Sequence, residues 1–184
     1  MKRQAELTVA VPKSNVGVVR AGGEYRLVAA RGILAGELLF RMEGEPSRSP
    51  TRYTVQIGEN LHLEMRSGMT AEEILDRYFW RFMNHSCDPN SFIHGRDVVA
   101  LHEIAPWEGV TFNYNTTEYD MAEPFDCRCG SVHCLGPIRG FKHLPESERR
   151  RLEPFLAGHL RPHLRAPGPG ARVPLEGYRP SPRA

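Results

Sequence analysis

The chain has 184 residues, of which 40% are apolar and 25% are charged, and its formal net charge is +2. This length suits one compact domain with a small appendage, and such a domain can bury a sufficient core without disulfides. Charges interrupt the apolar runs well before the ~20 residues that a membrane-spanning helix needs, and the segment after the first basic pair is too short for a secretory signal. We therefore expect a cytoplasmic protein with no membrane partner.

The charges are distributed unevenly along the chain. Residues 1–138 contain 14 Lys and Arg against 18 Asp and Glu, a net charge of −4, whereas residues 139–184 contain 10 against 4, a net charge of +6. A nucleic-acid-binding domain usually has a basic folded surface, so this distribution argues against nucleic acid as the partner. An acidic body suits a basic peptide, although an ordinary solvated surface explains the same charges equally well.

Short strands separated by turns are predicted over the first 64 residues. The β-prone runs are residues 16–19, 25–29, 38–42 and 53–57, with glycine, proline or asparagine between them. Thr70 then begins the one clear helix, because its hydroxyl can cap the first turn while Glu73 bonds back to the backbone. Apolar residues follow at helical spacing: Ile74, Leu75, Tyr78, Phe79 and Phe82.

Polar and cysteine-rich segments follow this helix. Residues 82–90, FMNHSCDPN, are too polar for a core strand and too rich in turn-forming residues to continue the helix. Two further strands are expected over residues 98–102 and 110–114, and a cysteine-rich knuckle over residues 125–138. Residues 144–164 favour short helices limited by two prolines, and residues 166–184 have the Pro- and Gly-rich composition of disordered segments.

The chain contains four cysteines: Cys87, Cys127, Cys129 and Cys134. The last three follow a Cys-x-Cys-x4-Cys pattern that places three thiolates within reach of one ion, for which zinc is the usual occupant. The fourth ligand is either the distant Cys87 or the nearby His133. Cys87 is preferred, because His133 and Cys134 are adjacent and would need awkward geometry to bind the same ion.

Three motifs occur in a fixed order: RFMNHSCDPN at residues 81–90, VTFNY at residues 110–114 and the cysteine pattern at residues 127–134. They resemble the RFxNHSCxPN segment, the terminal F-x-Y strand and the post-SET zinc motif of the SET-domain protein-lysine N-methyltransferase family. Residues 27–37 and 43–45 resemble two earlier blocks of that family. Because no cysteine-rich region precedes the SET blocks, the chain is most similar to minimal, bacterial-like members.

The resemblance implies a mainly β fold: small twisted β-sheets with a pseudoknot, one internal helix, a post-SET zinc knuckle and short C-terminal helices. It divides the chain into a SET domain at residues 1–120, the zinc knuckle at 121–143, a C-terminal helical appendage at 144–165 and a disordered tail at 166–184. In the family the NHSC cysteine, here Cys87, completes the site of one structural zinc ion. S-adenosylmethionine binds on one face, and the target lysine enters from the opposite face through a narrow channel.

The resemblance also assigns roles to individual residues. The family transfers methyl groups from S-adenosylmethionine to lysine side chains of a protein or peptide, with Tyr114 as the catalytic residue and Phe112 and Tyr114 in the lysine channel. A phenylalanine at position 112 implies di- or trimethylation, since a tyrosine hydroxyl there would hold a water in the space of a dimethylamine. The cofactor-binding candidates are Arg26, Leu27, Arg81, Asn84, His85 and Leu135.

One segment departs from the family pattern. Glu24-Tyr25-Arg26 replaces the family's Gly-x-Gly cofactor motif, and Gly22-Gly23 lie further upstream. Because glycine permits close approach of the backbone to a ligand, this departure keeps a SET-fold binding module without turnover as an alternative. A second alternative is an N-methyltransferase acting on a small peptide or an amine-bearing metabolite, since the sequence does not define the substrate rim.

Overall fold

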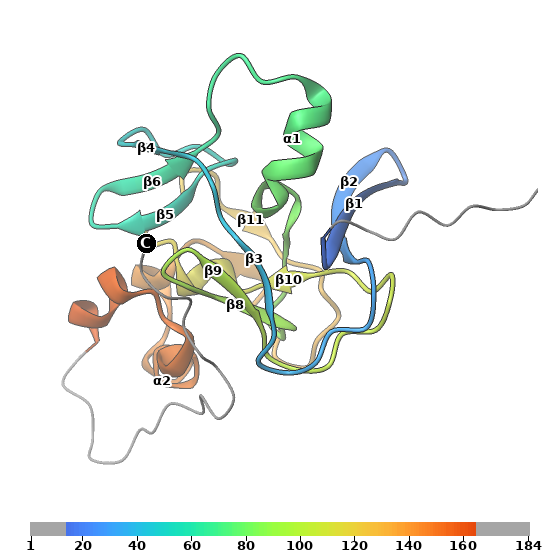
Figure 1. Ribbon diagram of the computed structural model, residues 1–184. Coiled ribbons are helices and arrows are strands. Elements are labelled where there is room, and N and C mark those ends of the chain that lie inside the picture. Colours follow the sequence, from blue (N-terminus) through green and yellow to red (C-terminus); the bar gives the residue numbers. More distant parts are fainter. Residues whose placement is uncertain (1–13, 165–184) are drawn as a thin grey trace, which may run out of the picture.

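The computed structural model describes residues 14–164, so the tail predicted for residues 166–184 lies outside the described residues. Within the described part, the strands form five small sheets of two or three strands each, and the helices are short (Figure 1). This architecture confirms the predicted mainly β fold with few helices. In residues 14–164 no helix has both the length and the apolar composition needed to cross a membrane.

A hairpin begins the described chain. Strands β1 (Val16–Ala21) and β2 (Glu24–Ala29) pair antiparallel and are joined by Gly22 and Gly23. These glycines have φ values of 61° and 88°, as the two central residues of a type I′ turn require. The two glycines that lie upstream of the family's usual cofactor motif therefore form the hairpin turn.

Two three-stranded antiparallel sheets contain most of the remaining strands. The first has the order β3 (Leu38–Arg41), β9 (Asp97–Ala100), β8 (Ser91–His94), and the second has the order β4 (Glu45–Ser47), β6 (Leu61–Glu64), β5 (Val55–Gly58). The sequence predicted β3, β5 and β9 but not β4, β6 or β8. The three missed strands have three or four residues each and include charged or histidine residues, so their strand pattern is weak without their pairing partners.

The helix predicted to begin at Thr70 is present but short. Helix α1 (Ala71–Arg77) has the expected capping box, in which Thr70 and Glu73 each bond to the backbone of the other. The chain then turns into the 3-10 helix η1 (Phe79–Phe82), where Trp80 is 2% exposed and donates its Nε1–H to the carbonyl of Glu43 at 2.8 Å. The apolar residues expected on one α-helical face are thus divided: Ile74 and Leu75 lie on α1, Tyr78 lies at the junction, and Phe79 and Phe82 lie on η1.

A short parallel pairing brings together two segments that are far apart in sequence. Strand β7 (Asn84–His85) lies beside β10 (Thr111–Phe112), with Asn84 opposite Thr111. The polarity of residues 82–90 gave no indication of this two-residue strand. After β10 the 3-10 helix η2 (Tyr114–Thr116) begins at once.

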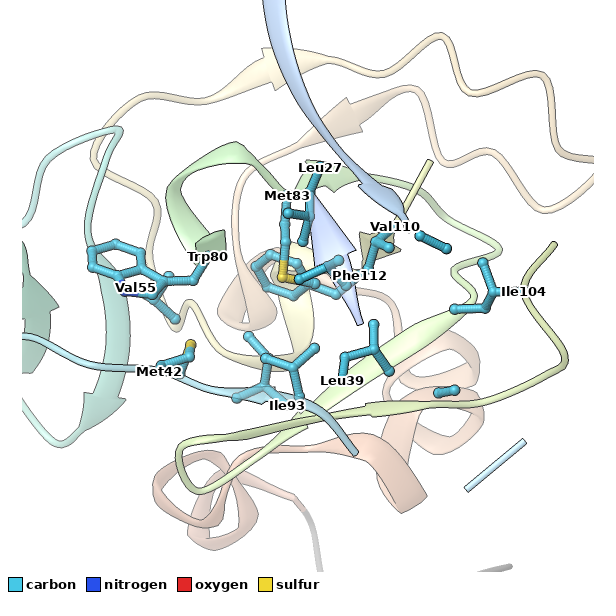
Figure 2. Packing of buried hydrophobic residues seen from close by; sticks show 14 of the residues in the cluster. Leu27, Leu39, Met42, Val55, Trp80, Met83, Ile93, Ile104, Val110 and Phe112 are labelled. Carbon is cyan, nitrogen blue, oxygen red and sulfur yellow. The ribbon is translucent and has the colours of Figure 1, made fainter. Parts of the chain in front are cut away.

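The main core lies between the sheets, the hairpin and η1. Figure 2 shows Phe112 at the centre of the displayed residues, with Val55 and Trp80 on one side and Ile104 on the other. Leu27 is 1% exposed in this cluster, and burying such a side chain stabilises the fold by about 1.5–3 kcal/mol. The core therefore fixes the strand that leads directly into Tyr114.

The C-terminal segment folds into short helices around a second apolar cluster. Its elements are β11 (Phe125–Asp126), β12 (Pro137–Ile138), η3 (Phe141–His143), α2 (Glu146–Leu152), η4 (Glu153–Phe155) and η5 (Gly158–His163). The amide of Ala157 donates to the carbonyl of Thr116 at 2.9 Å, and Phe155 packs on Phe92 with ring centroids 5.7 Å apart. The residue that joins η4 to η5 thus contacts the chain just after Tyr114, and α2 lies next to η4 (Figure 1).

Candidate functional site

Two cavities meet at Tyr114. The first is narrow, about 50 Å³, and the second is wider, about 630 Å³. Both cavities are lined by Tyr114, Arg52, Met121 and Glu123. A group held in the narrow cavity can therefore reach a group held in the wider one beside the Tyr114 side chain.

Tyr114 is held by one hydrogen bond from its side chain and one from its backbone. Its hydroxyl donates to the carbonyl of Met83 at 2.8 Å, and its amide donates to Nδ1 of His85 at 3.1 Å. Burial, followed by the nearby carboxylate of Glu118, raises the pKa of Tyr114 to about 12. The phenol therefore remains protonated at neutral pH and acts as an oriented dipole with free lone pairs, not as a base.

His85 connects Tyr114 to the cysteine cluster. Because its Nδ1 accepts the Tyr114 amide, its proton is on Nε2, which lies 3.3 Å from Sγ of Cys87. Burial lowers the pKa of His85 to about 4. The ring is consequently neutral, and its orientation is fixed by one bond on each side.

The narrow cavity combines apolar walls with charged residues. Phe112 is 4% exposed, and its ring centroid lies 4.7 Å from that of Tyr114. The other lining residues are Thr51, Arg52, Tyr53, Thr54, Val55, Trp80, Arg81, Met83, Glu118, Met121, Ala122 and Glu123. Arg81 lies over the Tyr53 ring, with its guanidinium carbon 4.9 Å from the centroid. The predicted channel residues Phe112 and Tyr114 are thus brought together in one cavity.

The wider cavity lies between the β7 segment and the cysteine-rich knuckle. Its lining residues include Glu24, Asn84, His85, Phe125 and Arg128. The Phe125 ring lies 5.6 Å from His85 and 5.9 Å from Tyr114, centroid to centroid. One wall of this cavity therefore comes from the NHSC segment and the other from residues around the cysteines.

The six predicted cofactor residues lie in different places. Asn84 and His85 line the wider cavity, whereas Arg81 lines the narrow one. Leu27 is in the core, and Arg26 is exposed on β2. Leu135 directs its backbone amide to Sγ of Cys87 at 3.4 Å, and its side chain packs against the C-terminal cluster. These assignments remain predictions.

Most of the other lining residues were not identified from the sequence, and three of them carry chemistry that matters for the site. Glu24 and Phe125 line the wider cavity, and Glu118 lines the narrow one. The position of Phe125, two residues before Cys127, was a usable signal, because an aromatic residue beside a knuckle can cover a ligand. Glu118 follows a run of polar residues, and no sequence pattern indicates that its carboxylate is buried.

The four cysteines converge on one point. Among the described residues, their sulfur atoms all lie within 4.8 Å of one another, and His133 is not part of the cluster. All four are free thiols, and Cys87 is buried while the other three are half-buried. This arrangement favours Cys87 over His133 as the fourth member of a metal site.

The environment of the thiols suits a bound cation. Burial raises the pKa of Cys87 to about 12. Burial acts in the same direction on Cys129, but backbone hydrogen bonds from Cys87 and Ser131, together with the neighbouring thiols, lower its pKa to about 6. One thiolate therefore forms readily at neutral pH, and further ionisation in this cluster requires a positive charge to offset the repulsion.

Comparison with known proteins gives matches over most of the described chain. The family model for the SET domain matches residues 24–115. The chain is 32% identical over 124 residues to "Methyltransferase flvH" of Aspergillus flavus, covering 65% of this chain and 60% of that protein. It is 29% identical over 144 residues to a histone-lysine N-methyltransferase, H3 lysine-36 specific, of Chaetomium globosum, covering 69% of this chain and 16% of that protein. The chain thus spans less than two thirds of the length of either relative.

Solved structures show the same fold. The complex of KRYPTONITE with mCHG DNA and SAH matches with a TM-score of 0.51 at 23% identity, covering 68% of this chain and 29% of that one. Arabidopsis thaliana SUVH6 in complex with SAM matches with a TM-score of 0.51 at 15% identity, covering 68% and 33% of the two chains. The residues matched by the family model, 24–115, include the NHSC segment and Tyr114 and make up half of the chain, so this protein belongs to the SET domain family.

Proposed function

We propose that this protein transfers methyl groups from S-adenosylmethionine to the side-chain amine of lysine in a protein or peptide. The observation that carries the proposal is the position of the Tyr114 hydroxyl where a narrow cavity, lined by both apolar and charged side chains, meets a wider one. A methyl transfer needs its two reactants to approach from opposite sides of the migrating group. Two cavities that meet at one oriented hydroxyl support this approach.

The wider cavity has the chemistry for a cationic, adenine-bearing methyl donor. When bound, S-adenosylmethionine supplies an electrophilic methyl group on a sulfonium sulfur. Neutral His85 places no positive charge beside that sulfonium, and Phe125 offers an aromatic face for the adenine. The Asn84 amide can both donate and accept hydrogen bonds, and the Glu24 carboxylate suits the ammonium group of the amino-acid end. Glu24 thus places a negatively charged side chain at a position where the family has glycine.

The narrow cavity suits the lysine side chain. Phe112, Trp80 and Met83 supply apolar surface for the methylenes. Attack requires a neutral amine, whereas a free lysine has a pKa near 10.4. Desolvation in this cavity lowers that pKa, and a decrease of about three units corresponds to roughly 4 kcal/mol. The lone pairs of the Tyr114 hydroxyl can accept an amine N–H and orient the nitrogen.

The cysteine cluster supports a structural role for one zinc ion. Four thiolates make a closed tetrahedral set with no open coordination position. Cys87 belongs to the NHSC segment, and the other three belong to the knuckle. A zinc ion held by Cys87, Cys127, Cys129 and Cys134 would join the two walls of the wider cavity, so we propose that the metal supports cofactor binding without taking part in the chemistry.

Phe112 supports di- or trimethylation as the product state. Its side chain lines the narrow cavity and has no polar atom to hold a water near the amine. A methylated amine is larger than the free amine and needs the space that such a water would fill. The buried phenylalanine leaves that space to the substrate.

The test is transfer of labelled methyl from S-adenosylmethionine to lysine peptides, starting with histone H3 peptides that contain lysine 36, because several relatives carry that specificity in their names. The wild type is compared with Tyr114→Phe, which removes only the hydroxyl. We expect kcat to fall about 10²-fold, while binding of S-adenosylhomocysteine, measured by calorimetry, stays within about twofold of wild type. Full activity of Tyr114→Phe would remove this residue from the mechanism.

A small amine-bearing molecule is the second candidate substrate. Arg52 and Arg81 line the narrow cavity, where a guanidinium can bind the carboxylate of an amino acid. The Aspergillus flavus relative is named as a methyltransferase with no protein substrate in its name. Parallel assays with free amino acids distinguish the two candidates, because only a small-molecule enzyme would label them faster than lysine peptides. Binding of the cofactor without label on either class would favour a binding module.

A further inference from the structure

Glu118 lines the narrow cavity, and only one of its two carboxylate oxygens accepts hydrogen bonds from the described residues. Its Oε1 accepts the backbone N–H of Gln56 at 2.8 Å and the hydroxyl of Thr117 at 3.3 Å, and the side chain is 12% exposed. Its Oε2 has no hydrogen-bond donor among residues 14–164. Among residues 14–164, the basic group within 4.0 Å of that oxygen is Nε2 of His62, at 3.8 Å. One oxygen is thus fixed by hydrogen bonds, and the other accepts none from the described residues, in a side chain that lines the cavity.

The groups that surround Glu118 do not neutralise it. Burial, together with His159, lowers the pKa of His62, so this ring is neutral at neutral pH and its 3.8 Å contact is not an ion pair. His159 directs Nε2 to the carbonyl of Thr117 at 2.8 Å, and burial lowers its pKa as well.

Neither arginine of the cavity forms an ion pair with Glu118. Arg52 lies 3.8 Å from Glu123 at the exposed rim, and Arg81 lies over Tyr53. Tyr114 is protonated. Burial raises the pKa of Glu118 to about 7, which places the carboxyl close to equal populations of its two protonation states at neutral pH. A buried carboxylate without a cation is costly, and an incoming ammonium group would supply the missing charge.

We propose that Glu118 binds the ammonium group of the substrate in the narrow cavity and accepts one of its protons. This inference rests on the proposed amine methylation and assigns a catalytic proton acceptor to it. An N–H bond breaks, its electron pair stays on nitrogen, and the proton forms an O–H bond with Oε2. The positive and negative charges cancel, leaving a neutral amine beside the Tyr114 hydroxyl. After product release the proton passes from Glu118 to water through the cavity mouth.

The pH profile of kcat/KM tests this assignment, because it reports the ionisation of free enzyme and free substrate. If Glu118 takes the proton, the wild type needs an ionised carboxylate and can bind lysine as the ammonium. Its kcat/KM should then rise up to the pKa of Glu118, about 7, and remain level until lysine itself loses its proton near pH 10.4. If bulk solvent takes the proton instead, kcat/KM should rise tenfold per pH unit throughout this range.

The variant to compare is Glu118→Gln, which preserves the size of the side chain and the acceptor for Gln56. We expect its kcat/KM at pH 7.5 to fall at least about 10²-fold, to rise tenfold per pH unit without a plateau, and to recover partly with a peptide whose amine has a lower pKa, such as S-aminoethylcysteine. Glu64→Gln is the matched control, since Glu64 is a half-buried carboxylate on β6 that lines neither cavity. It should retain the wild-type plateau. A plateau retained by Glu118→Gln would overturn the assignment.

A measurement that needs no turnover separates this inference from the proposed function. In protein labelled with ¹³C at glutamate carboxyls, the Glu118 signal, assigned by its absence from Glu118→Gln, should titrate near pH 7. Addition of n-butylammonium chloride should lower that midpoint, whereas n-butanol, which is similar in shape but neutral, should not. Equal responses to both compounds would overturn the ammonium contact. Absence of methyl transfer by the wild type would reject the proposed function, and the two results are independent.

Discussion

The two walls of the wider cavity are held by different forces. The wall formed by Asn84, His85 and Tyr114 is fixed by the parallel β7–β10 pairing and by the main apolar core. The opposite wall, around Phe125 and residues 127–129, is supported by two-residue strands and by the sulfur cluster. The first wall is therefore built by folding of the sheets, whereas the second depends on what the thiols bind.

Cys87 belongs to both walls. It is completely buried behind the first wall, and its sulfur receives the amide of Leu135 from the second at 3.4 Å. Arg151 of α2 directs its guanidinium to the Cys87 carbonyl at 3.4 Å, so the C-terminal helices also contact this point. One residue therefore connects the NHSC segment, the knuckle and the C-terminal helices.

Removing one thiolate from the knuckle should have the largest effect on the site, because it should abolish zinc binding. Binding of a structural zinc ion to such a site contributes about 10 kcal/mol or more to its folding free energy. We expect Cys129→Ser to lower zinc from one ion per chain to a small fraction, measured by mass spectrometry of the metal. The affinity for S-adenosylhomocysteine should fall about 10–100-fold. The first wall should survive, so the far-ultraviolet circular dichroism should change little.

His133→Ala is the control for this variant. His133 is exposed and lies beside Cys134, outside the sulfur cluster. Zinc content and cofactor affinity should both stay at the wild-type level. Loss of zinc from His133→Ala but not from Cys129→Ser would contradict the four-cysteine site and the distinction between the two walls.

The buried carboxyl group of Glu118 should make the free energy of unfolding depend on pH. The folded-state pKa is raised to about 7 from the ordinary 4.5, so between these values the folded protein binds more protons than the unfolded chain. Stability from this residue is then fully present below pH 4.5 and is lost as the pH rises through 7. The loss amounts to about 3 kcal/mol at most.

Glu118→Gln cannot ionise, and it should therefore be more stable than the wild type at pH 8 by up to that amount. The difference should become small at pH 5. Urea unfolding at both pH values measures it, with Glu64→Gln as the reference for loss of a less buried charge. A constant difference at the two pH values would contradict a raised pKa for Glu118.

Phe112→Tyr should give the smallest effect and should leave both walls intact. A hydroxyl at this position can hold a water beside the amine, and the loss or gain of one ordered water is worth about 0–2 kcal/mol. We expect the product to shift towards monomethyl-lysine, with cofactor affinity unchanged. Mass spectrometry of the methylated peptide measures the shift, and an unchanged distribution of products would refute the role given to Phe112.

Local features of the fold were predictable because neighbouring residues produce them. The Thr70 capping box, the strands ending near Ala29 and Ala100 and the short helices after residue 144 all follow from side chains within a few positions of each other. The β7 strand was not predictable, since Asn84 and His85 become extended only by pairing with residues 27 positions later. The strands β4, β6 and β8 were missed for a different reason: each has only three or four residues and includes charged or histidine residues, so its strand pattern is weak.

In the candidate site too, some features follow from local sequence and others from contacts between distant residues. The sequence by itself determined the family and the four thiols, and it predicted Asn84, His85, Phe112 and Tyr114 as site residues, because compact motifs contain them. Only the tertiary structure decided that His62, from β6, and His159, from η5, lie near Glu118. It also decided that Glu24 lines the wider cavity while Leu27 is in the core. Burial, and the pKa changes that burial causes, depend on contacts between distant parts of the chain, which no local pattern specifies.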